Sequence, residues 1–227
     1  MAERVEIEPI AHIRTDFPSK FGIPRQSGVV ESLRGRIVFE PSFRNVDYIR
    51  GIEKYTNLWL IWLFSANKHQ PNSPLVRPPR LGGNTHVGVF ATRSPYRPNP
   101  IGLSAVRIEK IDYDTPEGPV ISVRGADLMD GTPIYDIKPY IPYADAHPEA
   151  RGGFTDNNDW QPLEVIIPEE IVKAFTDTEL SSLKGVLSQD PRPQYHDDPE
   201  RIYGMPFASR DVKFKVDGNT LIVTGIE

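Results

Sequence analysis

The sequence contains no cysteine among its 227 residues. This absence excludes disulfide bridges, a thiolate nucleophile and every zinc site that depends on sulfur ligands. The chain also lacks a run of about 18 apolar residues, so no transmembrane span is expected. Its first residues do not show the basic and then apolar pattern of a secretion signal. We therefore expect a cytoplasmic protein that does not enter a membrane.

Acidic residues are missing from one long block of the chain. Between Lys54 and Arg107 there is no Asp or Glu, although the whole chain has 31 acidic and 26 basic side chains and a net charge of −5. The block carries seven cations, so the rest of the chain has a net charge of −12. The cations are Lys54, Lys68, Arg77, Arg80, Arg93, Arg97 and Arg107. This asymmetry predicts a surface or pocket that binds anions.

Proline is abundant, with 23 residues against a usual share of roughly 5%. Few long helices tolerate that density, so an all-helical bundle is not expected. Short β-rich runs joined by Gly/Pro loops occupy the first half and are typical of a barrel or sandwich. We predict a mainly β fold, with a barrel or sandwich over residues 1–145 and a small C-terminal α+β unit over residues 160–227.

Local patterns refine this prediction. Two β-rich runs flank Arg34-Gly35 and suggest a hairpin. Residues 46–55 suit a short helix, and the apolar run 58–64 predicts a strand buried on both faces. In the C-terminal unit, a helical stretch from Pro168 to about Leu187 should break near Thr176-Asp177, and residues 217–220 predict a hairpin turn.

Familiar catalytic and nucleotide-binding motifs are absent, and the five histidines lack the spacing of metal ligands. Four other segments are unusual: residues 22–28, 76–84, 88–104 and 127–140. Their prolines stiffen the loop, their glycines allow close approach to a ligand, and their Arg and Asn side chains supply hydrogen-bond donors. The alternative is that they are only tight turns of the barrel.

These four segments, together with Asp190-Pro191-Arg192-Pro193-Gln194-Tyr195, closely resemble the TsaA/TrmO-like family over essentially the whole chain. Members of this family are β-barrel tRNA methyltransferases that act on N6-threonylcarbamoyladenosine beside the anticodon. The resemblance implies S-adenosylmethionine as methyl donor, tRNA as partner, and a homodimer. It also implies that residues 1–145 form a β-barrel. No metal site is expected, because the chain lacks cysteine and its histidines lack the spacing of ligands.

The resemblance assigns site residues by motif. The implied cofactor-binding residues are Pro24, Arg25, Gln26, Ser65, Ala66, Arg93, Leu103, Asp127, Leu128, Met129 and Asp130. Family members often have His-Gln where this chain has Ser65-Ala66, so side-chain contacts from that loop are in question. The motif at 190–195 differs from the usual pattern only at Gln194, where Ala is common, and is expected to shape the substrate side of the pocket through Asp190, Arg192 and Tyr195.

Methyl transfer to N6 needs a weakly nucleophilic nitrogen to lose a proton or to have its anionic form stabilised. Asp130, Asp136 and Tyr140 are candidates, without a choice among them. Arg77, Arg80 and Arg97 are candidates for contacts to the substrate carboxylate and tRNA phosphates. Two other interpretations remain: a non-catalytic S-adenosylmethionine-binding regulatory module, and a plain RNA-binding barrel.

Overall fold

Short strands make up most of the ordered elements. The computed structural model describes residues 5–67, 73–81, 84–156, 161–192 and 198–227. The strands are β1 (Ala11–Thr15), β2 (Arg34–Phe39), β3 (Asn57–Leu63), β4 (Leu75–Val76), β5 (Val87–Gly88), β6 (Ile101–Asp112), β7 (Val120–Arg124), β8 (Pro133–Pro139), β9 (Glu164–Ile166), β10 (Tyr203–Phe207), β11 (Arg210–Asp217) and β12 (Thr220–Ile226). The α-helices are α1 (Pro142–Asp145), α2 (Glu169–Val172) and α3 (Asp177–Ser188). The mainly β class is therefore confirmed.

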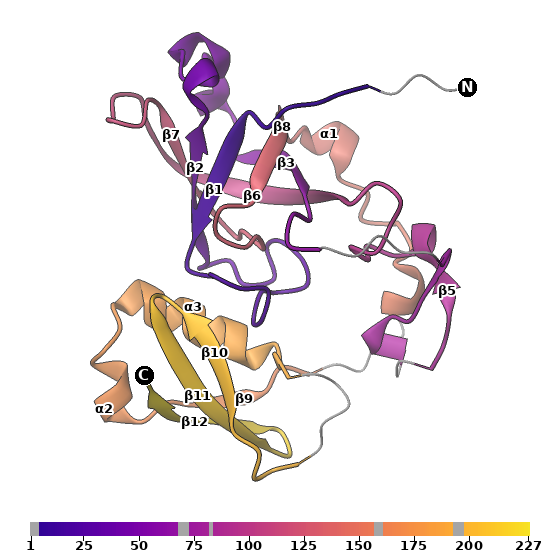
Figure 1. Ribbon diagram of the computed structural model, residues 1–227, viewed down its shortest axis with the longest axis vertical. Coiled ribbons are helices and arrows are strands. Elements are labelled where there is room, and N and C mark those ends of the chain that lie inside the picture. The colour runs from indigo at the N-terminus through magenta and orange to yellow at the C-terminus, as the bar shows by residue number, and fades with distance from the viewer. Residues whose placement is uncertain (1–4, 68–72, 82–83, 157–160, 193–197) are drawn as a thin grey trace.

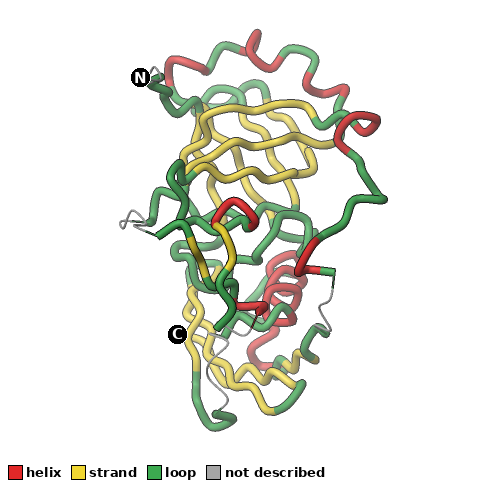
Figure 2. Tube along the Cα trace, turned by 90° about the vertical axis from the view of Figure 1, so that its right-hand side faces the viewer, coloured by secondary structure: helices red, strands yellow, loops and turns green. Residues whose placement is uncertain are grey.

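Six antiparallel strands form a closed barrel in the order β1-β2-β7-β6-β3-β8, with β8 pairing back onto β1 (Figures 1 and 2). Side chains alternate across each strand, so every second residue points inward. Ile13, Ile37, Leu60 and Ile121 are fully buried in this way and form the centre of the barrel core. No helix in the described part of the chain has the length and apolarity of a membrane span.

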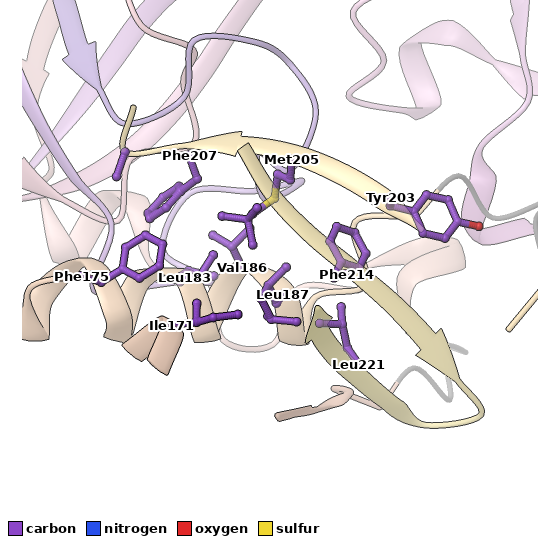
Figure 3. Packing of buried hydrophobic residues seen from close by; sticks show 14 of the residues in the cluster. Ile171, Phe175, Leu183, Val186, Leu187, Tyr203, Met205, Phe207, Phe214 and Leu221 are labelled. Carbon is purple, nitrogen blue, oxygen red and sulfur yellow. The ribbon is translucent and has the colours of Figure 1, made fainter. Parts of the chain in front are cut away.

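The C-terminal unit is a four-stranded sheet with strand order β10-β11-β12-β9, in which β9 runs parallel to β12. Helix α3 packs on one face of this sheet, and Leu183 and Leu187 share a buried cluster with Met205 and Phe214 (Figure 3). Thr176 caps α3: its side chain accepts from the backbone N–H of Glu179, whose carboxylate accepts from the N–H of Thr176. The predicted helix break and the predicted β11–β12 hairpin are both confirmed.

The segment between β1 and β2, residues 16–33, connects the two cores. Its apolar residues Phe17, Val30 and Leu33 are buried in the core of the C-terminal unit, although both flanking strands belong to the barrel. The Ser182 hydroxyl of α3 donates to the Ser32 carbonyl at 2.9 Å. The β1–β2 segment therefore lies between the barrel and the C-terminal unit (Figure 1).

Three local predictions were wrong. The proposed hairpin at Arg34-Gly35 is a single strand, β2, because residues 29–33 leave the barrel for the other core. The helix predicted over 46–55 is two 3-10 turns, η2 (Val46–Ile49) and η3 (Ile52–Lys54), separated by Gly51 at φ 91°. Strand β3 is not buried on both faces, because Trp59, Ile61 and Leu63 are only partly covered on the outside of the barrel.

Candidate active site

The candidate site lies where β6 separates from β7. The two strands pair from Arg107 and Arg124 onward, and the first part of β6 pairs with β3 alone. One edge of residues 101–106 is thus left without a strand partner from β7. The β1–β2 segment and the turn after β7 meet along this edge.

The β1–β2 segment is held against this edge by hydrogen bonds. The Ser27 hydroxyl accepts from the backbone N–H of Ala105 at 3.1 Å, and the N–H of Gly28 donates to the carbonyl of Gly125 at 2.9 Å. Gly125 has φ 75°, and a Cβ there would lie 3.2 Å from the Gly28 backbone. The close approach therefore requires glycine at position 125. Gln26, the residue before Ser27, accepts a hydrogen bond from the Arg93 guanidinium through its side-chain oxygen.

The carboxylate of Asp127 lies beside Ser27 and Arg93. The Ser104 hydroxyl donates to its Oδ1 at 2.6 Å, and Ser104 in turn accepts from the indole N–H of Trp62 at 2.9 Å. Burial raises the pKa of Asp127 above its ordinary value. The Ser104 hydrogen bond, backbone hydrogen bonds of Asp127 and Ser27, and the positive charge of Arg93 act in the opposite direction. Gln26, Ser27, Arg93 and Asp127, from three separate loops, therefore form one polar cluster.

The carboxylate of Asp130 is bound at the end of β1 and not in this polar cluster. Its carboxylate accepts from the backbone N–H of Thr15 at 3.0 Å and lies 3.6 Å from the Arg14 guanidinium. The Thr15 hydroxyl also donates to the carbonyl of Leu128 at 3.0 Å. This turn is therefore fastened to the end of β1, and the carboxylate of Asp130 already has partners within the fold.

The turn after β3 carries Ser65, which is exposed, and Ala66, which is half-buried. The adjoining Asn67 accepts from the Lys20 ammonium at 3.1 Å, so the turn contacts the β1–β2 segment. Asn67 Nδ2 is buried without a hydrogen-bond partner among the described residues. A ligand acceptor at this position would satisfy it, which fits a cofactor bound between the turn and the segment.

The remaining cofactor candidates differ in exposure. Pro24 is buried, Arg25 is exposed and Met129 is half-buried. Leu128 is 1% exposed and packs in the barrel core, so it contributes only backbone to any ligand site. Leu103 is 55% exposed on the outer face of β6, opposite in direction to the buried Ser104.

The other two candidates for a base lie away from the cluster. Asp136 stands opposite Ile61 in the β3–β8 register, on the outer face of the barrel, and pairs with Lys138 at 2.7 Å. Tyr140 follows the far end of β8, where its ring packs on Trp59 with centroids 5.4 Å apart. Asp130 precedes β8, Asp136 lies within it and Tyr140 follows it, so the three candidates occupy three different places in the fold.

Most of the candidate substrate-binding side chains already form hydrogen bonds with residues close to them in the sequence. Arg77 donates to His86 at 2.9 Å, and Arg97 donates to the Thr92 carbonyl at 3.1 Å, so each supports its own loop. After α3, Arg192 binds both carboxylate oxygens of Asp190, at 2.8 and 2.9 Å. Tyr195 and the side chain of Arg80 lie outside the described residues.

Sequence reasoning passed over Ser27 and Ser104, although both stand in segments that it singled out. A signal for Ser104 was present. Along β6 the inward positions are Gly102, Ser104 and Val106, so a serine occupies a place where the alternation demands an apolar residue. Ser27 gave no such signal, because only the fold reveals the strand edge that it covers.

Comparison with known proteins agrees with this architecture. The family model of the tRNA-methyltransferase O N-terminal domain matches residues 12–146, and that of the TrmO C-terminal domain matches residues 161–227. A tRNA (adenine(37)-N6)-methyltransferase of Escherichia coli is 35% identical over 219 residues, 93% of each chain. A putative S-adenosylmethionine-dependent methyltransferase of Pseudomonas aeruginosa is 39% identical and covers 91% of this chain and 90% of its own. A crystal structure of TrmO from Pseudomonas aeruginosa superimposes with a TM-score of 0.80 at 31% identity, covering 99% of both chains.

The chain therefore belongs to the TrmO family and is a methyltransferase. The resemblance inferred from its four loop segments and its C-terminal motif is confirmed.

Proposed function

We propose that this protein transfers a methyl group from S-adenosylmethionine to N6 of N6-threonylcarbamoyladenosine beside the anticodon of tRNA. The observation that carries the proposal is the convergence of Gln26, Ser27, Arg93 and Asp127 at the unpaired edge of β6. Relatives that span nearly the whole chain are named for adenine-N6 methylation of tRNA and for dependence on this cofactor.

The residues present fit the proposed cofactor. When bound, S-adenosylmethionine supplies a methyl group on a positively charged sulfur. Asp127 offers a carboxylate to balance such a cation, and Arg93 and the buried Asn67 amide offer donors to its oxygen and nitrogen acceptors. The rigid β1–β2 segment aligns the donor, and alignment alone contributes several kcal/mol to such a displacement.

Within this proposal, the acid-free block contacts the anionic substrate through Arg77 and Arg97. Asp130, Asp136 and Tyr140 stay proposals for the group that accepts the N6 proton. The carboxylate of Asp130 is nearest in the chain to Asp127; its Oδ1 accepts from the Thr15 N–H, and its Oδ2 keeps lone pairs that can accept a proton. The Asp190–Arg192 pair fixes the backbone at the start of the 190–195 motif, which we propose shapes the substrate side of the pocket.

We also propose that the protein acts as a homodimer. An apolar strip on the outer barrel face supports this: Leu103 and Ile101, 55% and 43% exposed, stand opposite Ile61 and Leu63 of β3. A strip of exposed apolar side chains is typical of a protein contact. Light scattering in solution checks it, and a monomeric mass at micromolar concentration contradicts it.

Transfer of labelled methyl groups tests the function. Purified protein and labelled S-adenosylmethionine are incubated with tRNA that carries threonylcarbamoyladenosine and with the same tRNA lacking it. We expect label only in the first. Equal labelling of both refutes the substrate assignment, and cofactor binding without transfer to either favours the regulatory module.

An Arg93→Ala variant tests the location of the site in the same assay. The matched control is Arg50→Ala, since Arg50 is also exposed but pairs with Asp47 in η2, at the barrel end away from the C-terminal unit (Figure 1). We expect Arg93→Ala to lose at least tenfold in cofactor affinity or transfer, because it removes a charged donor. Arg50→Ala should match the parent. Unchanged Arg93→Ala rates and affinity refute the placement.

A further inference from the structure

Trp62, Ser104 and Asp127 form a directed chain of hydrogen bonds from the barrel core to the candidate site. Trp62 on β3 is 7% exposed, and Ser104 on the neighbouring β6 is fully buried. The indole nitrogen lies 2.9 Å from Ser104 Oγ, which lies 2.6 Å from Asp127 Oδ1. The chain thus links two inward-facing barrel residues to a carboxylate at the mouth of the barrel.

The chemistry of the three groups fixes the direction of this chain. An indole N–H can only donate, so Ser104 Oγ is the acceptor in the first bond. The single hydroxyl proton of Ser104 is then free to point at Asp127. A separation of 2.6 Å lies in the range of a hydroxyl bonded to an ionised carboxylate. Trp62 therefore orients Ser104, and the hydrogen bond from Ser104 favours the ionised form of Asp127.

Burial works against that ionised form. The carboxylate is partly withdrawn from water, and this desolvation favours its protonated state. Among the described charged groups, the Arg93 guanidinium is the one whose field opposes this. Arg93 is exposed and already donates to Gln26, so Ser104 supplies the shielded, fixed donor.

We infer that Ser104 is a positioning residue, which keeps Asp127 ionised and oriented so that its carboxylate can receive the cationic part of the methyl donor. The inference rests on the proposed function, since it takes S-adenosylmethionine as the ligand. It adds a residue that makes no contact with solvent and acts only through Asp127.

Calorimetric titration of S-adenosylmethionine into the full-length protein across a pH series tests this inference. Binding to the parent should hold above the pKa of Asp127 and weaken as the pH falls through it. In Ser104→Ala, the loss of a hydrogen bond to a charged group should move that midpoint upward by about one to two pH units. At a pH below both midpoints, affinity should fall about 10- to 100-fold, and it should approach that of the parent at high pH.

Two further variants separate positioning from folding. Ser182→Ala is the matched control, because Ser182 is 2% exposed and also donates its hydroxyl, but to the Ser32 carbonyl in the other core. Its pH midpoint should equal that of the parent. Ser104→Cys keeps the size and offers only a weak donor, so an intermediate midpoint is expected even if Ser104→Ala does not fold.

Combining Ser104→Ala with Asp127→Asn gives a double-mutant cycle. In Asp127→Asn the pH dependence should flatten, and adding Ser104→Ala should change affinity by less than twofold, since the group through which Ser104 acts is gone. A Ser104 variant with the parent's midpoint, or with a loss equal at every pH, overturns the inference. Absence of binding to the parent at every pH refutes the proposed function itself, and the inference with it.

Discussion

Replacing Gly102 by alanine disturbs the core end of the Trp62–Ser104–Asp127 chain without substituting any of its three members. A Cβ at Gly102 would lie 2.3, 2.5 and 2.7 Å from Cε2, Cζ2 and Cδ2 of the Trp62 ring. The ring cannot move aside easily, because it packs edge-on against Phe64 with centroids 4.3 Å apart and donates to Ser104. Overpacking of this kind costs about 1–3 kcal/mol, and a lost hydrogen bond adds about 1 kcal/mol. We expect a total loss of about 2–4 kcal/mol in the free energy of unfolding.

Urea unfolding followed by tryptophan fluorescence measures this loss. The midpoint should fall while the slope with urea stays the same. Gly225→Ala is the control, since its Cβ would meet no atom within 4 Å and its φ is not in the left-handed region. The double variant with Trp62→Phe should lose less than the sum of the two single losses, because the smaller ring makes room. A Gly102→Ala midpoint equal to that of the parent refutes the packing argument.

Four further substitutions test other parts of the fold. Burial and two nearby carboxylates raise the pKa of Asp16, so its ionised form costs stability above pH 3.8. Asp16→Asn should raise the free energy of unfolding at pH 7 by less than about 1 kcal/mol and leave it unchanged near pH 3. Thr176→Ala removes the cap of α3 and should cost about 0.5–2 kcal/mol in urea unfolding. Gly22 has φ 89°, and a Cβ there would lie 2.3 Å from the Met205 sulfur. Gly22→Ala should therefore displace the β1–β2 segment and lower both the free energy of unfolding and the affinity for the cofactor. Gly28→Ala, with φ 77° and open space, should show only the backbone cost of about 1 kcal/mol.

Each of these expectations can fail in a recognisable way. A gain for Asp16→Asn that persists at pH 3 would contradict the electrostatic explanation. Thr176→Ala with the parent's midpoint would show that the cap does not limit the stability of α3. If Gly22→Ala and Gly28→Ala lose equally in stability and affinity, the Met205 contact does not position the β1–β2 segment.

Sequence patterns predicted those strands whose neighbours lie within the barrel. The strand predicted over residues 58–64 agrees with β3, Asn57–Leu63, to within one residue, because an unbroken apolar run is a local property. Residues 29–33 show why other elements were not found. Val30 and Leu33 look like strand residues, yet their burial comes from a helix and a sheet about 150 residues further along the chain. No local pattern carries that information.

The same limit applies to the site. The motifs correctly indicated loops that meet, since Gln26, Arg93 and Asp127 lie in one cluster. They could not separate Asp127 from Asp130, three residues apart in one turn. That distinction depends on β1: the end of this strand offers the Thr15 N–H to Asp130, whereas Asp127 faces Ser104 across the opening between β6 and β7. Which partner each carboxylate meets is a property of strand register.

The C-terminal unit contributes no side chain to the polar cluster of Gln26, Ser27, Arg93 and Asp127. Its core nevertheless holds the segment that carries Gln26 and Ser27. Phe17, Val30 and Leu33 anchor the β1–β2 segment on both sides of Gln26 and Ser27, and burying each anchor contributes about 1.5–3 kcal/mol. Those anchors pack on α3 and the sheet, not on the barrel. The C-terminal unit thus anchors both ends of the segment, and the barrel domain supplies the charged groups, Arg93 and Asp127, that the segment meets.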